Sequence, residues 1–194
     1  MDGLSEAKAD RRIRKTKKAL RDGLTKLMEE KSIKDISVKE LTDMIDINRG
    51  TFYLHYKDVF DMIEQIEAEL FHDFTSVMLA HNPKTMNGTP LPLLKDIFIF
   101  LKENATICEA LMSSNGDIAF VNQLKEIVRN KCLNACMELY RNGKIENWEY
   151  YYSFILSGCI GLFETWLNNG LTETPEHMAK LAEIMILGGM QVFQ

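Results

Sequence analysis

SVKELTDMIDINRGTFYLHYKD, residues 37–58, has the pattern of two short helices joined by a tight turn. Ser37 followed three residues later by Glu40 is a capping box, which predicts that a helix begins at Val38. The residues that recur at i, i+3, i+4 and i+7, and so share one face of this helix, are Val38, Leu41, Thr42 and Ile45.

The turn and a second helix follow directly. Asp46 tolerates the left-handed backbone that a tight turn requires, and Ile47 is expected to be buried after it. Asn48 is a good N-cap for a helix that is predicted to run from Arg49 to about His55. Two short helices joined by a turn of this length predict a helix-turn-helix.

The second helix has an inward and an outward side. Phe52 and Tyr56, four residues apart, are expected to face inward. The residues left at its start and on its outward side are Arg49, Gly50, Thr51, Tyr53 and His55. A helix N-terminus presents N–H donors and the positive end of a dipole to phosphate, and a glycine lets the backbone come close. These features predict a face that docks on nucleic acid.

The same stretch resembles the DNA-binding signature of TetR-type transcriptional regulators. In that family a basic residue, a glycine and a threonine open the recognition helix, and an aromatic-Tyr-x-His-aromatic run follows. The matching run here is Arg49-Gly50-Thr51-Phe52-Tyr53-Leu54-His55-Tyr56. Two positions depart from the family pattern, because Thr42 stands where alanine is usual and Asp46 where glycine is usual. Both departures are sterically tolerable.

The expected DNA contacts divide into two kinds. Phosphate contact is expected from Ser37, Lys39, Tyr53, His55 and Lys57. Contact with base edges is expected from Arg49 and Thr51, and secondarily from Asn48 and Leu54, with Gly50 allowing the close approach. Tyr53 and His55 could instead only pack against the head.

The charge of the chain is unevenly distributed. Up to Lys57 there are 14 Lys and Arg against 10 Asp and Glu, a balance of +4, and the remainder has 9 against 18, a balance of −9, which together give the net charge of −5. An anionic partner is therefore expected at the N-terminal end. A first helix is predicted from about Ala9 to Lys31, and its leading run RRIRKTKK is either a solvated helix start or a phosphate contact.

The rest of the chain predicts an all-α fold. Helical spacing recurs in five segments, which are residues 58–80, 91–103, 105–112, 118–142 and 148–169, and Gly170 closes the last of them. Thr174 is expected to cap a final helix that begins at Pro175. We expect residues 1–57 to form a three-helix DNA-binding domain, which a long helix joins to a larger regulatory and dimerisation domain of residues 58–194.

The last two helices carry small residues where helices usually avoid them. Gly158 and Gly161 lie in mid-helix, although each costs roughly 1 kcal/mol relative to alanine. This favours a close partner surface over packing within the chain, and the expected dimer interface comprises Gly158, Leu162, Thr165, Trp166, Met178, Leu181, Ala182 and Met185. The segment from Ser153 to Leu181 resembles the C-terminal region of TetR-type regulators of the Firmicutes type, in which two helices pair with their copies in a four-helix bundle.

The resemblance implies a homodimeric regulator, acting as a repressor, that binds a palindromic operator in double-stranded DNA. It also implies release by a small molecule, for which an apolar or aromatic compound is expected. Residues that could line its cavity, or could simply form core, are Phe71, Phe74, Met78, Phe98, Met112, Phe120, Tyr140, Phe154 and Phe163.

Other classes are less well supported by the sequence. An interaction protein, a coactivator that works through a protein partner, is compatible with the acidic body. An enzyme is not indicated, because there is no phosphate loop, HExxH or GxSxG motif.

No cofactor or metal is expected, and Cys108, Cys132, Cys136 and Cys159 are expected to be buried thiols, with a redox pair of Cys132 and Cys136 as the alternative. The longest nearly apolar run, Phe154 to Phe163, is too short to span a bilayer, so a cytoplasmic protein without membrane contact is expected.

Overall fold

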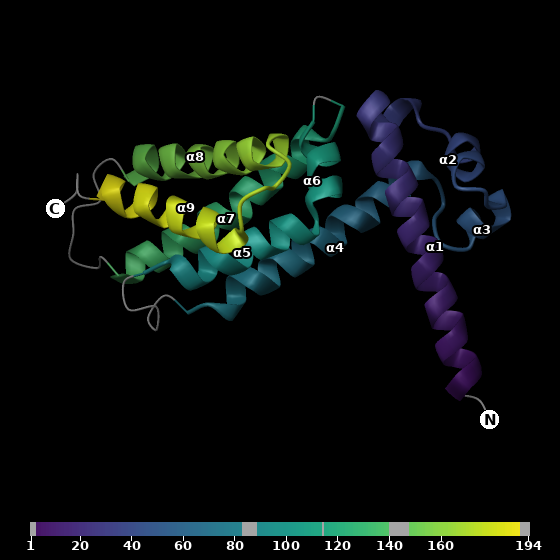
Figure 1. Cartoon of the computed structure of the whole chain (residues 1–194), viewed down its shortest axis with the longest axis horizontal. Helices are drawn as coiled ribbons and strands as arrows, with labels where there is room; N and C mark the ends of the chain where they lie inside the picture. The colour runs from purple at the N-terminus through teal and green to yellow at the C-terminus, as the bar shows by residue number, and fades with distance from the viewer. Residues whose placement is uncertain (1–2, 83–88, 114, 140–147, 191–194) are drawn as a thin grey trace. The chain divides into compact units, whose positions relative to one another are not determined.

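The computed structural model describes residues 3–82, 89–113, 115–139 and 148–190, and all regular structure in these ranges is helical. The α-helices, labelled in Figure 1, are α1 (Gly3–Glu30), α2 (Val38–Met44), α3 (Arg49–Tyr53), α4 (Val59–Ala80), α5 (Leu91–Glu103), α6 (Ala105–Met112), α7 (Ile118–Leu139), α8 (Trp148–Asn168) and α9 (Pro175–Met190), and a short 3-10 helix spans Ile33–Asp35. The predicted all-α fold is confirmed.

The chain forms two compact units. One comprises Met1–Leu70 with Thr106–Phe120, and the other comprises Phe71–Ala105 with Val121–Gln194. The predicted domain boundary after Lys57 was drawn from charge and motif, whereas the two units are defined by contacts within the fold. The boundary after Lys57 stays a prediction.

The first unit is built on contact between α1 and α2. The buried hydrophobic side chains among the described ones of α1 are Leu20, Leu24, Leu27 and Met28, each no more than 2% exposed. A Cβ on Gly23 would lie 2.6 Å from Cγ2 of Ile45 and 3.0 Å from Cδ1 of Leu41, so glycine is what lets the two helices come this close. The start of α1 differs from the sequence prediction, because the helix begins at Gly3 and not at Ala9.

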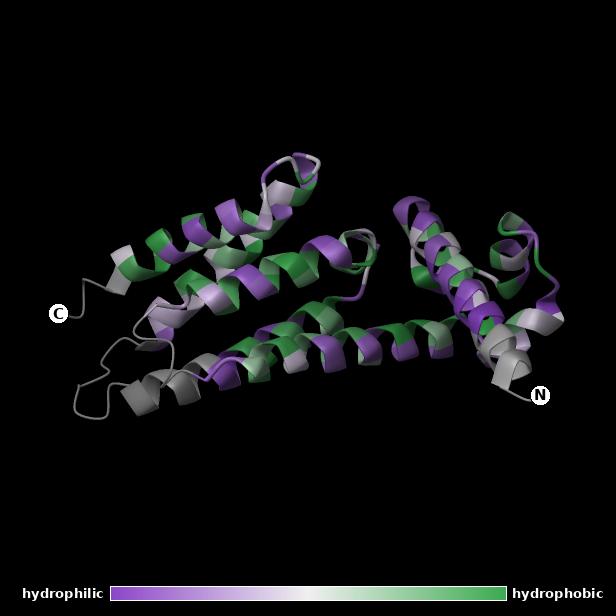
Figure 2. Ribbon diagram, turned by 60° about the horizontal axis from the view of Figure 1, so that its bottom comes forward, coloured by the Kyte–Doolittle hydropathy of each residue, from purple (hydrophilic) through white to green (hydrophobic). Residues whose placement is uncertain are grey.

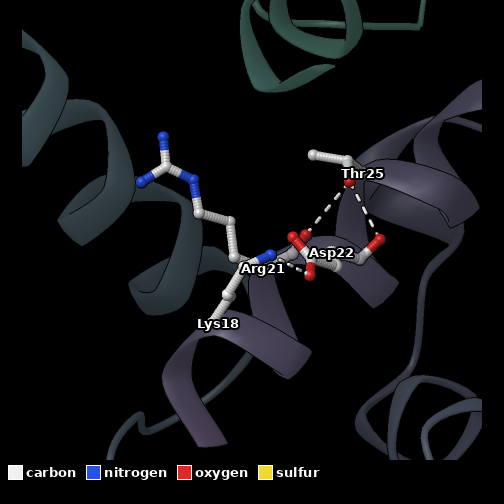
Figure 3. A network of polar contacts seen from close by, with 4 residues as sticks. All are labelled: Lys18, Arg21, Asp22 and Thr25. Atoms are coloured by element: carbon white, nitrogen blue, oxygen red, sulfur yellow. Dashed lines mark hydrogen bonds and ion pairs between the residues drawn. The ribbon is translucent and has the colours of Figure 1, made fainter. Parts of the chain in front are cut away.

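A polar residue on the buried side of α1 is satisfied within the helix itself. Thr25 is only 3% exposed, and its hydroxyl donates to the carbonyl oxygens of Arg21 at 3.2 Å and Asp22 at 2.9 Å. On the same helix, Lys18 Nζ pairs with the Asp22 carboxylate at 2.6 Å (Figure 3). Thr25 therefore occupies the core without leaving an unpaired donor, which would be costly in an apolar interior.

The second unit has Trp166 at its centre. The indole is 1% exposed, its Nε1–H donates to the Glu173 carbonyl at 3.3 Å, and its ring lies 5.6 Å from that of Phe98 and 6.5 Å from that of Phe163. It thus joins α8 to α5 and to the loop before α9. Figure 2 shows hydrophobic and hydrophilic residues alternating along these helices, as amphipathic packing requires.

The junction between α8 and α9 confirms the predicted turn. Gly170 has φ +74, and the Leu171 N–H donates to the Trp166 carbonyl at 2.9 Å, which satisfies one of the last carbonyls of α8. The Thr174 hydroxyl accepts from the His177 N–H at 3.2 Å, and α9 begins at Pro175. Both helix ends are therefore determined by local chemistry.

Within the described ranges, no helix combines the length and apolar character that crossing a bilayer demands. The same residues contain no cluster of three His, Cys, Asp or Glu side chains that could hold a metal ion. Cys108 is a buried free thiol whose pKa burial raises to about 12, and Cys159 is a half-buried free thiol. The side chains of Cys132 and Cys136 lie outside the described residues.

The carboxyl group of Glu67, in the first unit, is partly buried in an environment that disfavours its charged form. Oε1 of Glu67, on α4, is buried without a hydrogen-bond partner among the described residues. Burial raises the pKa of Glu67 to about 7, and the nearby charges of Asp117 and Glu64 act in the same direction. The folded chain therefore holds a proton on Glu67 at pH values where the unfolded chain has released it.

We predict that Glu67 makes the protein less stable as pH rises from about 4.5 to 7, because the folded state must either keep the proton or bury a charge. Glu67→Gln removes this titration. The variant should gain stability relative to the wild type at pH 8, with a smaller difference at pH 5, as measured by urea unfolding. Glu103→Gln, at an exposed position of α5, is the control. A pH dependence of unfolding that is the same in all three proteins would contradict the assignment.

Candidate nucleic-acid interface

The start of α2 is fixed by a cap. Ser37 has an extended backbone, and its hydroxyl accepts from the Glu40 N–H at 3.2 Å, as predicted. The second half of the capping box is replaced, because the Glu40 carboxylate binds Lys31 Nζ at 2.5 Å. This ion pair raises the pKa of Lys31 and ties the end of α1 to the start of α2.

The turn after α2 accommodates both departures from the family pattern. Asp46 adopts the left-handed conformation, with φ 54, and the Ile47 N–H donates back to the Thr42 carbonyl at 3.0 Å. Thr42 is fully buried, but its hydroxyl donates to the Val38 carbonyl at 2.9 Å. Ile47 is half-buried, so the prediction that it is buried was too strong.

The recognition helix α3 is short and capped. Asn48 Oδ1 accepts from the Gly50 N–H at 2.7 Å, which confirms the predicted N-cap. A Cβ on Gly50 would lie 3.2 Å from the same Oδ1, so a larger residue would crowd the cap. The helix ends at Tyr53, earlier than the predicted His55.

Two aromatic rings anchor α3 to the head. Phe52 is completely buried and Tyr56 is 6% exposed, with their ring centroids 5.7 Å apart, so both face inward as predicted. Tyr53 stands at right angles to Phe52 at 5.5 Å but keeps 58% of its surface exposed. Leu54 is 80% exposed. The outward side of α3 is thus open to a partner.

The predicted DNA-contact residues lie together in the first unit, on α2, α3 and the segments beside them. Those with exposed side chains or backbone are Ser37, Lys39, Asn48, Arg49, Gly50, Tyr53, Leu54 and Lys57. Thr51 and His55 are half-buried, and the His55 ring lies 6.3 Å from that of Tyr56. For His55 the packing alternative therefore gains support, whereas Tyr53 has most of its ring available for contact.

Carboxylates lie next to the predicted phosphate contact at Lys57. The Lys57 N–H donates to Asp61 Oδ2, and the Asp61 N–H donates to Asp58 Oδ1, both at 2.8 Å. The hydrogen bond from Lys57 is the main cause that lowers the pKa of Asp61. These bonds cap α4 and fix the backbone at Lys57.

The candidate cavity residues do not line one cavity in the described structure. Phe74, Met78, Phe98 and Phe163 are buried in the second unit, where Phe74 packs on Phe100 at 5.6 Å, and Phe71 is half-buried. Met112 and Phe120 belong to the first unit, and Tyr140 lies outside the described residues. Phe154 differs from the others, because its side chain is 71% exposed within one chain, and its place in a cavity stays a prediction.

A cleft of about 330 Å³ lies elsewhere, between α7 and α8. Its lining combines charged, hydroxyl and apolar groups and comprises Lys125, Glu126, Arg129, Glu149, Tyr152, Ser153, Leu156 and Ser157. The Arg129 guanidinium spans it to Glu149 Oε1 at 3.2 Å. None of the predicted cavity residues contributes to this cleft.

The candidate dimer residues divide by exposure. Gly158, Thr165 and Met185 are exposed, and Leu162 and Leu181 are half-buried. Trp166, Met178 and Ala182 are at most 4% exposed within the single chain. These three residues therefore belong to the core of the second unit, and the prediction that they contact a partner directly is corrected. The physical reason is that α9 packs on α5, and the Trp166 ring of α8 lies against Phe98 of α5.

Three further exposed apolar side chains on α8 and α9 were missed. Tyr150 is 79% exposed, Ile184 61% and Leu187 37%, and they accompany the exposed Phe154. The spacing of Tyr150, Phe154, Gly158, Gly161 and Thr165 places them on one side of α8. This spacing of three and four residues was readable in the sequence.

Comparison with known proteins identifies the family. Residues 88–188, more than half of the chain, match the TetR family model described as "Transcriptional regulator C-terminal region". A search of curated proteins found no match.

Several solved structures share the fold. The TetR transcriptional regulator from Streptococcus agalactiae 2603V is 22% identical with a TM-score of 0.58, over 93% of this chain and 98% of that one. The dihydroxyacetone kinase operon activator DhaS is 15% identical with a TM-score of 0.58, over 92% and 98%. The regulator FadR from Bacillus subtilis, in complex with stearoyl-CoA, is 16% identical with a TM-score of 0.60, over 88% and 97%.

A capped helix-turn-helix followed by a larger set of helices defines a class of transcriptional regulators that dock one helix on DNA. On the strength of the family match, the chain belongs to the TetR family of transcriptional regulators.

Proposed function

We propose that the protein is a homodimeric, sequence-specific DNA-binding repressor that a small ligand releases from its operator. The observation that carries the proposal is the recognition helix, which is capped by Asn48, anchored by Phe52 and exposed on its basic and aromatic side. In this proposal residues 1–57 are the DNA-binding domain and residues 58–194 the regulatory and dimerisation domain.

The contacts with DNA follow from exposure and chemistry. Arg49 is exposed at the first position of α3, where a guanidinium can bond two acceptors of a guanine edge. Lys57 and Lys39 are exposed cations suited to phosphate, and Ser37 and Tyr53 offer hydroxyls. Two copies of such a head would read half-sites about one turn of DNA apart, which is the reason for proposing a palindromic operator.

The partner surface is proposed on α8 and α9. Gly158 and Gly161 are helix positions at which a Cβ would meet nothing within 4 Å, so packing inside the chain does not account for glycine there. Around them Phe154, Tyr150 and Ile184 expose large apolar surface. A second copy of the chain would cover these side chains and use the glycines for close approach.

The ligand is proposed to be apolar or aromatic and to bind in the second unit. The support is the number of aromatic and Met side chains buried there, such as Phe74, Met78 and Phe163. FadR, which shares the fold, is in complex with stearoyl-CoA, an acyl compound with a long apolar chain. The helix α4 contributes residues to both units and is the element through which binding would act on the head.

An activator that works through a protein partner is the second candidate. It is favoured by the fold shared with DhaS, which is an operon activator. The acidic balance of the chain after Lys57 suits a basic protein partner better than nucleic acid. Selection of genomic DNA fragments distinguishes the two, because a coactivator without DNA contact enriches none.

The first prediction on DNA concerns Arg49 and Lys57, each changed to alanine. Arg49→Ala should cost about 1–3 kcal/mol at one base position and relax the preference there. Lys57→Ala should weaken binding to all sequences. It should also reduce the slope of the logarithm of the binding constant against the logarithm of the salt concentration by about 0.9, because one phosphate contact is lost. Lys180→Ala, an exposed cation on α9, is the control. Fluorescence anisotropy with the selected DNA fragment and its single-base variants measures the affinity of all three proteins. If both Arg49→Ala and Lys57→Ala lose the same affinity for every sequence, base readout by Arg49 is refuted.

The dimer is tested by a matched pair of substitutions. Thr165 and Ser76 both lie near the C-terminal end of a helix, are exposed, and donate a hydroxyl hydrogen bond to a carbonyl four residues earlier, at 2.8 and 2.9 Å. Thr165→Arg should give monomers because it places a charge in the proposed interface, whereas Ser76→Arg should leave the dimer intact. Light scattering at micromolar concentration gives the mass of each protein in solution. A wild-type protein with the mass of a monomer would contradict the proposal.

Coupling between ligand and DNA is the third prediction. A ligand that releases DNA must bind the two states with different affinity, typically by about 1–3 kcal/mol, and operator DNA must change ligand affinity by the same factor. Stearoyl-CoA is the first probe to try, in calorimetric titrations with and without saturating operator. Affinity should fall in the presence of operator. If the probe binds with equal affinity in both titrations, release by this class of ligand is excluded.

A further inference from the structure

The turn between α6 and α7 packs with the helix-turn-helix, although it is far from it in the sequence. It lies in the segment Thr106–Phe120, which belongs to the first unit. The Asn115 side-chain amide donates to the Met28 carbonyl at 3.3 Å, beside the end of α1 (Figure 1). Met28 is one of the last four residues of α1, whose carbonyls have no acceptor role within the helix ladder. We call Ser113 and Asn115–Asp117 the α6–α7 turn, and the bond from Asn115 to Met28 the latch.

The shape of the α6–α7 turn is fixed by its own hydrogen bonds. The Gly116 N–H donates to the Ser113 carbonyl at 3.0 Å, and the Asp117 N–H donates to the Leu111 carbonyl at 3.1 Å. A Cβ on Gly116 would lie 2.1 Å from the Leu111 carbonyl oxygen, so only glycine fits there. Asp117 Oδ1 accepts from the Ala119 N–H at 2.7 Å and so caps α7. The Asp117 carboxylate therefore cannot turn away without removing this cap.

The charged groups that face Glu67 of α4 are both acidic. They are Asp117, from the α6–α7 turn, and Glu64, three residues earlier on the same face of α4. Lys17 of α1 does not compensate them, because its Nζ lies 3.9 Å from Oε1 of Glu69, which points to a different side of α4. Oε1 of Glu67 is buried and has no hydrogen-bond partner among the described residues. An ionised Glu67 would thus be a buried charge between two other carboxylates.

The proton on Glu67 is therefore coupled to the position of the turn. Burial, and then the charges of Asp117 and Glu64, raise the pKa of Glu67 from 4.5 to about 7. A turn that moves away exposes Glu67 to water and removes Asp117 from its surroundings, so the raised pKa returns toward the ordinary value. Contact of the turn with α4 is then fully favoured below about pH 4.5 and is progressively lost as pH rises through 7.

We infer that Glu67 is a proton sensor for the latch: the protonated side chain holds the α6–α7 turn on the head, and the ionised side chain releases it. The inference goes beyond the proposed function, because it requires neither DNA nor a ligand. Thermodynamic linkage gives it a reciprocal form. If the proton favours the latch, then breaking the latch must lower the affinity of Glu67 for its proton.

The reciprocal effect is tested with Asn115→Ala and a matched control. Asn104→Ala removes the same side chain, whose amide donates to the Phe100 carbonyl at 3.0 Å within its own helix end. Carbon-13 NMR of the Glu carboxyl groups gives the titration midpoint of Glu67, identified by its absence in Glu67→Gln. The midpoint should be near 7 in the wild type and in Asn104→Ala, and lower in Asn115→Ala. An ordinary midpoint in the wild type, or no change in Asn115→Ala, overturns the inference.

The latch itself is observed through the side-chain amide of Asn115, in the nitrogen-15 spectrum of the full-length protein. From pH 4.5 to 8 the ratio of latched to released turn should fall on the order of a hundredfold, since each unit of pKa difference is a factor of ten. The Asn115 signal should move toward that of a free amide in the wild type and stay in place in Glu67→Gln. Glu109→Gln, an exposed carboxyl on α6, should behave as the wild type.

The same spectra distinguish release of the turn from unfolding of the whole unit. Backbone signals of buried residues of α1, such as Leu24, should not change over the pH range in which the Asn115 signal moves. An Asn115 signal that is independent of pH, or that moves only together with Leu24, overturns the inference. Both measurements use the protein without DNA, so their outcome is independent of the proposed function.

Discussion

The burial of Phe52 is the constraint on which the rest of the head depends. A helix of five residues has no stability of its own in water, because nucleation costs more than so few hydrogen bonds return. The Phe52 side chain, completely buried, fixes α3 in the head, where α3 packs on α2 and the Phe52 ring meets that of Tyr56. The orientation of α3, and with it the exposure of Arg49 and Tyr53, follows from that one inward-facing ring.

Around this anchor the backbone is determined residue by residue. Ser37 and Asn48 each occupy an N-cap position and accept from a backbone N–H, and Asp46 supplies the left-handed residue between the helices. These features could be predicted from sequence because each depends on neighbours within a few residues. The same holds for Gly170 and Thr174 at the other end of the chain.

The predictions that needed correction depend on distant contacts. Trp166 and Phe154 both lie on α8 and both read as large apolar residues, yet one is 1% exposed and the other 71%. Only the position of α5 and α9 decides which side of α8 is covered, and periodicity alone does not identify that side. The end of α3 is similar, because Tyr56 packs inward as expected although the helix has already ended at Tyr53.

The buried indole of Trp166 also makes the second unit optically observable. The chain contains two tryptophans, Trp148 and Trp166. A shielded indole emits at shorter wavelength than one in water, and its hydrogen bond to the Glu173 carbonyl and its contacts with Phe98 and Phe163 come from three separate segments. In a chain whose other tryptophan is replaced by phenylalanine, emission from this one residue reports rearrangement of α5, α8 and the α8–α9 turn without any attached dye.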